Sequence, residues 1–403
     1  MKVSLLQKIV TVLIVAIIGC ATSFGCTSAL VGVDRGADGR WLLWKHRDSG
    51  HPDNYIKKFE ATDSSLAYVA LFNAADTAAR EAWIGFNSAG FAVMNTASYN
   101  IPAPAKDWQD REGILMSDAL RHCRTLEDFH QLLLNHSGKR GVQANFGAFD
   151  ANGNGAYFET SDENVVMFPL DSIGFSTRTN YSLSGGKANR LGLSRHRAAI
   201  HLIDSILTTD RHWAPKGKLS AEDFIETLSR SFYLPEKGID LLDGTAPRYR
   251  DSGDVISRRS SCSSVVIEGP LPSEDPAKTM IMWTAIGFPS LSTVDAVTLD
   301  SIPNHLLPTI RHRDVDPGAT VSLHSSKCDS INILRDKSFI KNAMKPNRAT
   351  KNKKPTYDFN LEFLRKEIPI RRAASLTNYA PARARRHHLQ KESSSQTTPP
   401  SDR

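Results

Sequence analysis

The sequence predicts an α+β protein in which groups of short strands are separated by pairs of helices. Three observations support this class. Short segments rich in β-branched and aromatic residues dominate the first half, helical periodicity appears between strand groups, and strands do not alternate singly with helices as in a βαβ sheet. A hydrophobic fraction of 40% and a charged fraction of 23% in 403 residues are typical of a globular protein with a substantial core.

The predicted strands are bounded by Gly, Asp or Asn. A turn at Asn152-Gly153 predicts a hairpin between two of them. In chain order the strands are Ser28–Asp34, Arg40–His46, Ala67–Asn73, Ala82–Asn87, Phe91–Thr96, Asn145–Asp150, Gly155–Thr160, Ser264–Glu268 and Thr279–Ala285.

Three helical segments are expected. Thr125-x-x-Asp128 is a capping signal for a helix with Leu126, Phe129 and Leu133 on one side. The segment Ser194–Thr208 places its apolar residues on one helical face, and Ser220-x-x-Asp223 precedes another short apolar face.

The C-terminal region is basic and poor in large apolar residues. Residues 335–403 hold 17 Lys or Arg and 6 Asp or Glu, whereas residues 26–334 have a net charge of −6. We therefore expect a main domain at 26–340, an extension of uncertain structure at 341–372, and a disordered basic tail at 373–403. Truncation after Arg372 should leave activity and melting temperature nearly unchanged, although the tail can contact anionic surfaces weakly.

The charge distribution gives no sign of a nucleic-acid-binding core, because the basic residues are confined to the tail. The sequence also predicts no metal and no cofactor. The cysteines 26, 123, 262 and 328 include no CxxC pair, and Cys123 and Cys262 are expected to be buried.

The N-terminal 25 residues have the layout of a secretory signal: two lysines, an apolar run from Ile9 to Ile18, and small residues before Cys26. Cleavage there would give Cys26 a free α-amino group. A thiol and an amine on one residue form a nucleophile and its base. The alternative is a non-enzymatic lipoprotein anchored at Cys20.

A charged cluster follows on the next predicted strand. If Gly36–Gly39 forms the turn, antiparallel pairing brings Lys45 and Asp48 close to Cys26, where a carboxylate can hold the amine and a cation can favour the thiolate. The alternative is a surface charge cluster at a strand end.

At this point the sequence resembles a family. Separated motifs over roughly residues 26–300 are similar to those of the N-terminal-nucleophile (Ntn) hydrolases of the choloylglycine hydrolase, penicillin V acylase and isopenicillin-N acyltransferase group. They are Cys26-Thr27, Gly39-x-x-Leu42-x-x-Lys45-x-x-Asp48, Gly85-Phe86-Asn87-Ser88-Ala89-Gly90-Phe91 leading to Asn95, Asn145-Phe146-Gly147, Thr179-Asn180, Ser194-Arg195 and Ser264-Val265-Val266-Ile267.

The resemblance implies a four-layer αββα sandwich and roles for five residues besides Cys26. Asp48 would hold the amine, Asn95 (through its backbone or its side chain) and Asn180 would donate to the oxyanion, and Arg195 would orient the site. Lys45 stands where bile-salt and penicillin V enzymes carry arginine, and Arg47 is the alternative cation. Asn95 as a plain turn residue also stays open.

The function expected is an exported cysteine amidase, periplasmic or extracellular, that hydrolyses linear non-peptide C–N bonds of a small-molecule amide through a thioester on Cys26. Acyl transfer to an amine acceptor is the alternative within the same chemistry. The sequence is compatible with an oligomer.

Overall fold

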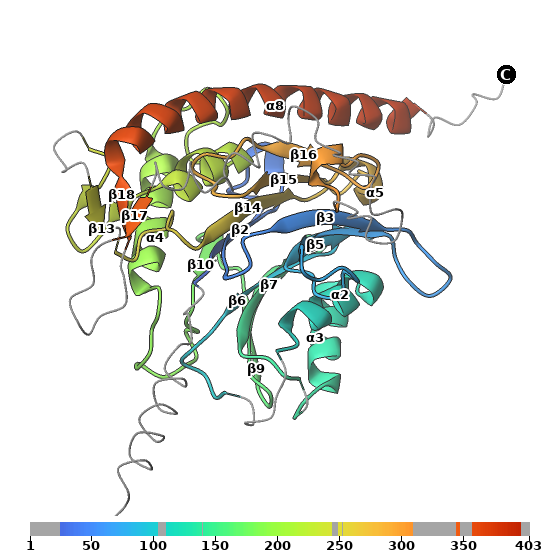
Figure 1. Ribbon diagram of the computed structural model, residues 1–403. Coiled ribbons are helices and arrows are strands. Elements are labelled where there is room, and N and C mark those ends of the chain that lie inside the picture. The colour runs from blue at the N-terminus through green and yellow to red at the C-terminus, as the bar shows by residue number, and fades with distance from the viewer. Residues whose placement is uncertain are drawn as a thin grey trace, which may run out of the picture.

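The computed structural model describes residues 25–103, 110–138, 140–243, 249–251, 253–308, 344–346 and 357–395. Two large antiparallel sheets form its centre, and helices lie on the outer face of each sheet (Figure 1). The predicted α+β class is confirmed. The predicted signal segment, Cys20 and Cys328 lie outside the described residues, except that Gly25 is described.

The six-stranded sheet contains the strand that follows Cys26. Its register pairs Thr27 with His46, so the turn at η1 (Ala37–Gly39) brings the end of the second strand beside the start of the first, as predicted. The strand order is β10 (Phe175–Arg178), β1 (Thr27–Val31), β2 (Leu42–Asp48), β14 (Ser261–Glu268), β15 (Ile281–Ile286) and β16 (Asp295–Val297).

The seven-stranded sheet is a meander in chain order. Its strands are β3 (Asn54–Phe59), β4 (Tyr68–Asn73), β5 (Ile84–Asn87), β6 (Ala92–Ala97), β7 (Ala144–Phe149), β8 (Gly155–Thr160) and β9 (Val165–Pro169). The predicted β7–β8 hairpin is confirmed: Gly153 has a φ of 86°, and the Asp150 carboxylate accepts from the backbone nitrogens of Asn152 and Asn154. Neither β3 nor β9, both partly exposed, was among the predicted strands.

Helices α2 (Glu112–His122) and α3 (Leu126–Asn135) cover the seven-stranded sheet. The capping box of α3 is present, with the Thr125 side chain accepting from the Asp128 nitrogen and the Asp128 carboxylate accepting in return. Helix α4 (Leu193–Thr208) lies within one residue of its prediction and covers the six-stranded sheet with η2 (Asp223–Thr227) and η3 (Leu228–Arg230). Helix α2 was not predicted.

Three hydrophobic clusters separate these layers. One lies between α2, α3 and the seven-stranded sheet, the second lies between the two sheets, and the third lies between the six-stranded sheet and its helices. Because both faces of a central strand are covered, successive residues of β2 enter different clusters: Leu43 packs between the sheets, whereas Leu42 and Trp44 face the helices.

The prediction of a disordered tail from residue 373 is wrong over the described residues. Helix α8 (Leu361–Ser395) runs across the outer side of the molecule above β15 and β16 (Figure 1). A small sheet joins β13 (Tyr249–Asp251), β18 (Tyr357–Asn360) and β17 (Met344–Pro346), so the described residues after 340 form strands and a helix. The remaining short elements are β11 (Tyr233–Leu234), β12 (Ile239–Asp240), α5 (Pro276–Thr279) and η4 (Asn304–Leu306).

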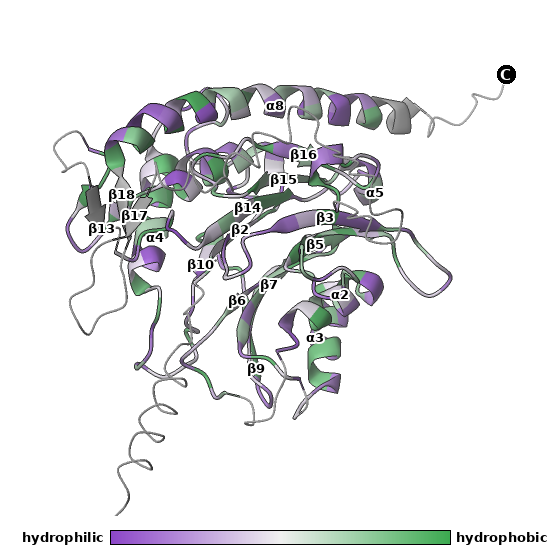
Figure 2. Cartoon of the chain, in the orientation of Figure 1, coloured by the Kyte–Doolittle hydropathy of each residue, from purple (hydrophilic) through white to green (hydrophobic). Residues whose placement is uncertain are grey.

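The described part of the tail is ordered because side chains of α8 pair with buried residues of the six-stranded sheet, and composition alone does not reveal such contacts. Tyr379 is 3% exposed, and its ring packs against Trp283 of β15 in a tilted arrangement with the ring centres 4.6 Å apart. Arg386 is also buried and binds the carboxylate of Glu268, which Arg383 contacts at 3.0 Å. In Figure 2, α8 is largely hydrophilic while β15 beneath it is hydrophobic, and the arginines that suggested a solvated tail instead neutralise buried carboxylates.

Candidate active site

Cys26 immediately precedes β1, at the edge of the six-stranded sheet where β2 ends. Its thiol is partly exposed, and Sγ lies 4.0 Å from the backbone oxygen of Asp48. Cys26 is here joined to Gly25, whose carbonyl oxygen accepts a hydrogen bond of 2.9 Å from Nη2 of Arg258. A Cβ at Gly25 would lie 1.8 Å from that nitrogen, so only glycine fits between Cys26 and Arg258 as they stand.

Arg195, in the first turn of α4, reaches Cys26 from the helical side. Its Nη1 donates to the Cys26 carbonyl oxygen at 2.5 Å and to Oγ1 of Thr27 at 3.0 Å. Its Nη2 donates to Oδ1 of Asn180 at 2.8 Å. Arg195 as a whole is 1% exposed. The structure therefore brings Arg195 and Asn180, both predicted site residues, to the nucleophile candidate.

Asn180 lies on a segment that other side chains hold in place. Nδ2 of Asn145, from one of the family motifs, donates to the carbonyl oxygens of Thr179 and Tyr181 at 3.1 and 3.2 Å. Nδ2 of Asn180 itself donates to the Ala97 carbonyl oxygen at 2.9 Å. An amide nitrogen carries two hydrogens, so this bond uses one of its two donors.

Asp48 is buried, and both of its carboxylate oxygens accept hydrogen bonds. Oδ2 accepts from Nε of Arg258 at 2.7 Å, and Oδ1 accepts from Oγ of Ser261 at 2.7 Å. The Arg258 guanidinium thus bridges the Asp48 carboxylate and the Gly25 carbonyl oxygen. Asp48 consequently lies beside the Gly25–Cys26 junction, where the predicted role requires it.

Arg258 is a site residue that the sequence reasoning missed. Besides Asp48 and Gly25, it contacts Asp254, whose Oδ1 accepts from Nη1 of Arg258 at 2.9 Å and from Nε of Arg195 at 2.8 Å. Burial opposes the charged guanidinium, yet Asp48 and Asp254 raise the pKa of Arg258 above its ordinary value. The only sequence signal was an arginine pair just before a predicted strand, a pattern typical of solvated surface.

Lys45 and Asn95 meet on the opposite side of Cys26. Nζ of Lys45 donates to Oδ1 of Asn95 at 2.5 Å and to the Trp83 carbonyl oxygen at 2.8 Å. Nδ2 of Asn95 donates to the carboxyl group of Glu112, a second residue that sequence reasoning missed. Asn95 is therefore not a plain turn residue: it lies within β6 and connects a buried amine to a buried carboxyl group.

Burial shifts the pKa values of Lys45 and Glu112, the two ionisable groups that Asn95 connects. It lowers the pKa of Lys45 to about 8, although the neighbouring Cys26 thiol opposes that shift. It raises the pKa of Glu112 to about 8, and the nearby Asp110 adds to this effect. Each shift favours the neutral form of its group, as expected for ionisable groups removed from water.

Arg47, the alternative cation, also lies beside Trp83 but has different hydrogen-bond partners from Lys45. Nη1 and Nη2 of Arg47 donate to the side-chain oxygens of Asn54 and Asn73, each at 2.8 Å, and its guanidinium lies 4.8 Å from the Trp83 ring centre. Lys45 is therefore the better candidate for a cation that acts on Cys26.

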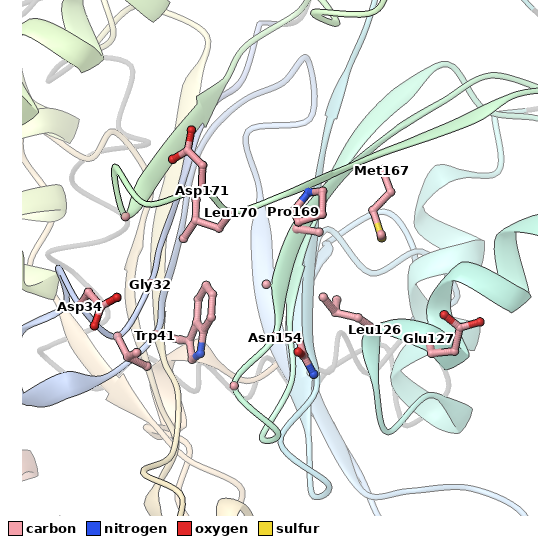
Figure 3. Close-up of a pocket in the computed structure, with 15 residues that line it drawn as sticks. Gly32, Asp34, Trp41, Leu126, Glu127, Asn154, Met167, Pro169, Leu170 and Asp171 are labelled. Atoms are coloured by element: carbon pink, nitrogen blue, oxygen red, sulfur yellow. The ribbon is translucent and has the colours of Figure 1, made fainter.

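One cavity is separate from these residues. It measures about 560 Å³ and lies near Gly32 and Asp34, beyond the far end of β1 from Cys26. Trp41 lies between Asp34 on one side and Asn154 and Leu126 on the other (Figure 3). None of the predicted site residues lines this cavity.

No family model and no curated protein matches the chain. Solved structures similar to it include an N-acylethanolamine-hydrolyzing acid amidase ortholog from Caenorhabditis elegans, at 13% identity and a TM-score of 0.40 over 62% of this chain and 95% of that one. A variant of conjugated bile acid hydrolase from Clostridium perfringens has 13% identity and a TM-score of 0.42 over 72% of this chain and 100% of that one. Penicillin V acylase from Agrobacterium tumefaciens has 14% identity and a TM-score of 0.41, over 69% and 87% of the two chains. The last two carry names from the group that the sequence motifs resemble.

Within the described residues, no cluster of three or more His, Cys, Asp or Glu side chains is arranged to bind a metal ion. No helix in that part of the chain has the length and apolar character needed to cross a membrane.

Proposed function

We propose that this chain is an exported cysteine amidase that hydrolyses linear, non-peptide amides through a thioester on Cys26. The observation that supports this most is the convergence of predicted residues around Cys26. Lys45 and Asp48 come from β2, Asn180 from the segment after β10, and Arg195 from α4. The hydrogen bond between Arg195 and Cys26 spans 169 positions of sequence.

Activation begins with removal of residues 1–25, which frees the α-amino group of Cys26. An α-amine titrates ordinarily near 7.7–8.0, so at neutral pH it can accept and return a proton. Asp48 lies beside the Gly25–Cys26 junction and can accept a hydrogen bond from the new amine. Arg258, which then loses the Gly25 carbonyl, stays bound to Asp48 and Asp254.

In the first half of the reaction, Sγ of Cys26 attacks the amide carbonyl carbon while the thiol proton passes to the α-amine. The carbonyl oxygen becomes an oxyanion, for which the second amide hydrogens of Asn180 and Asn95 are the candidate donors. One such donor contributes about 2.7–4 kcal/mol in comparable enzymes. The cationic neighbours Lys45 and Arg258 favour the thiolate.

In the second half, the ammonium gives its proton to the leaving nitrogen, the C–N bond breaks and an acyl thioester remains on Cys26. Water then attacks the thioester carbonyl and passes a proton to the α-amine. The C–S bond breaks, the carboxylic acid leaves, and the proton returns to the thiol. The chemistry needs no redox partner and no group outside the chain.

The order of layers supports the same proposal. Helices, sheet, sheet and helices follow one another with a hydrophobic cluster at each boundary, as in the αββα sandwich that the resemblance implies. The secretory layout of residues 1–25 supports export to the periplasm or the exterior.

The intact mass of the exported protein tests the first requirement. A chain that starts at Cys26 is expected, whereas a lipid-modified start at Cys20 would replace the amidase with an anchored lipoprotein. The second test is Cys26→Ser, which should abolish most turnover across a panel of N-acyl amino acids, acyl-amines and β-lactams while the unfolding midpoint is retained. Cys123→Ser is the matched control, because Cys123 is buried at the end of α2, away from the site.

Acyl transfer uses the same thioester and differs only in the second nucleophile. Product analysis with a competing primary amine separates the two activities. Free acid as the sole product at every amine concentration identifies a hydrolase.

A further inference from the structure

A buried histidine and a buried serine lie next to Asp48, at the carboxylate oxygen that the Arg258 guanidinium does not bind. Oγ of Ser261 is 2.7 Å from Oδ1 of Asp48 and 2.8 Å from Nε2 of His46. His46 is fully buried and Ser261 is 6% exposed. His46 and Asp48 lie on β2, and Ser261 begins β14. The two strands pair so that Ser261 is opposite Asp48. The mechanism described above uses Asp48 but neither of the other two.

The contacts of Ser261 decide which atom donates in each hydrogen bond between His46, Ser261 and Asp48. A carboxylate has no proton to give, so the single hydroxyl proton of Ser261 goes to Asp48 at 2.7 Å, the nearer and charged acceptor, rather than to the Ile256 carbonyl oxygen at 3.4 Å. The hydroxyl oxygen can then accept two hydrogen bonds. One comes from the backbone nitrogen of Arg258 at 3.0 Å, and the other must come from Nε2 of His46. His46 is therefore the tautomer with its proton on Nε2.

The charge state of His46 agrees with this assignment. Burial lowers its pKa to about 4, with Arg258 and Arg195 acting in the same direction and Asp48 opposing them. At neutral pH the imidazole is uncharged and acts as a fixed donor rather than a proton acceptor. The Asp48 carboxylate is thus held by Ser261 at Oδ1 and by Arg258 at Oδ2.

We propose that Ser261 and His46 are positioning residues that hold the Asp48 carboxylate in the orientation required to bind the Cys26 amine. This inference rests on the proposed function, in which that amine carries the proton between thiol and leaving group. Ser261 acts directly on Asp48, and His46 acts through Ser261 by occupying one of its lone pairs.

The test compares Ser261→Ala with Ser263→Ala in the mature protein. Ser263 lies two residues further along β14, is equally buried, and its hydroxyl has no hydrogen-bond partner among the described residues. A hydrogen bond to a charged group is worth enough to change rates by roughly 10- to 100-fold. Ser261→Ala should therefore lower kcat/KM by at least about 10-fold, whereas Ser263→Ala should leave it unchanged.

A pH profile separates positioning from a general loss of packing. The α-amine must be unprotonated to accept the thiol proton, so its pKa sets the acidic limb of the profile. Ser261→Ala loosens the carboxylate that stabilises the ammonium, so the amine should lose its proton more readily and the acidic limb should move to lower pH. His46→Leu should show a smaller movement in the same direction. His46→Gln, which retains an amide donor, should restore the parent profile.

The rate of Cys26 alkylation by iodoacetamide across the same pH range supplies a readout that needs no amide substrate. If Ser261→Ala and Ser263→Ala give the parent alkylation and kcat/KM profiles, the positioning role is wrong while the amidase proposal stands. If Cys26→Ser retains turnover, the amidase mechanism fails, and the alkylation profiles alone decide whether Ser261 acts on the Cys26 site.

Discussion

Replacing Arg386 with methionine should destabilise the folded protein at neutral pH, because Glu268 would lose its closest cation. Arg386 on α8 binds the Glu268 carboxylate at the end of β14, and their side chains are only 4% and 5% exposed. Burial alone would raise the pKa of Glu268, but Arg386 and Arg383 outweigh it and lower that pKa from 4.5 to about 2.

The magnitude follows from the shift. A difference between 4.5 and about 2, at 1.36 kcal/mol per pKa unit, corresponds to about 3 kcal/mol of stability at pH 7. Loss of one partner from a buried ion pair has a comparable cost, about 3–5 kcal/mol. Because the folded-state pKa is lowered, this stability is present above pH 4.5 and is lost as the pH falls toward 2. At pH 3 less than half of the roughly 3 kcal/mol should remain.

Urea unfolding of the parent and Arg386→Met at pH 7 and pH 3 measures both quantities. Arg385→Met is the matched control, since Arg385 is the neighbouring residue on α8 and its side chain is exposed. The control should match the parent at both pH values. If Arg386→Met is as stable as Arg385→Met at pH 7, or if its deficit is the same at pH 3, the ion pair does not contribute as argued.

Three further predictions concern the body of the protein. Truncation after Arg372 should lower the melting temperature by several degrees, contrary to the sequence-based expectation, because it removes Tyr379, Arg383 and Arg386; an unchanged melting curve would mean that α8 does not stabilise the fold. Glu112→Gln should flatten the dependence of the unfolding free energy on pH. Burial raises the pKa of Glu112 to about 8, so its protonated carboxyl stabilises the protein below about pH 4.5, and this contribution is lost as the pH rises to 8. If urea unfolding gives the parent and Glu112→Gln the same change in unfolding free energy between pH 5 and pH 8, the shift is contradicted. Thr125→Ala should cost about 1 kcal/mol through loss of the α3 cap, and an unaltered unfolding free energy would show that the cap is dispensable.

Sequence motifs predicted part of the candidate site. The order of motifs predicted that Cys26, Asp48, Asn180 and Arg195 belong together, and the structure places all four within one hydrogen-bonded group. Their catalytic roles stay predictions. The surroundings of Asn95 were not predictable, because the Glu112 carboxyl that binds its amide comes from a helix that lacked a clear sequence signal.

Local patterns determined most of the secondary structure from the sequence alone. Alternation and turn residues located the β1–β2 and β7–β8 pairs, and the Thr125 cap located α3, because each depends on residues a few positions apart. Tertiary structure alone decided where charges meet. Arg258 binds Asp48, which is 210 positions away in the sequence, and Arg386 binds Glu268, which is 118 positions away. A buried charge is stable only beside a partner of opposite charge. When that partner lies far away in the sequence, folding brings the two together, so no local sequence pattern can identify the pair.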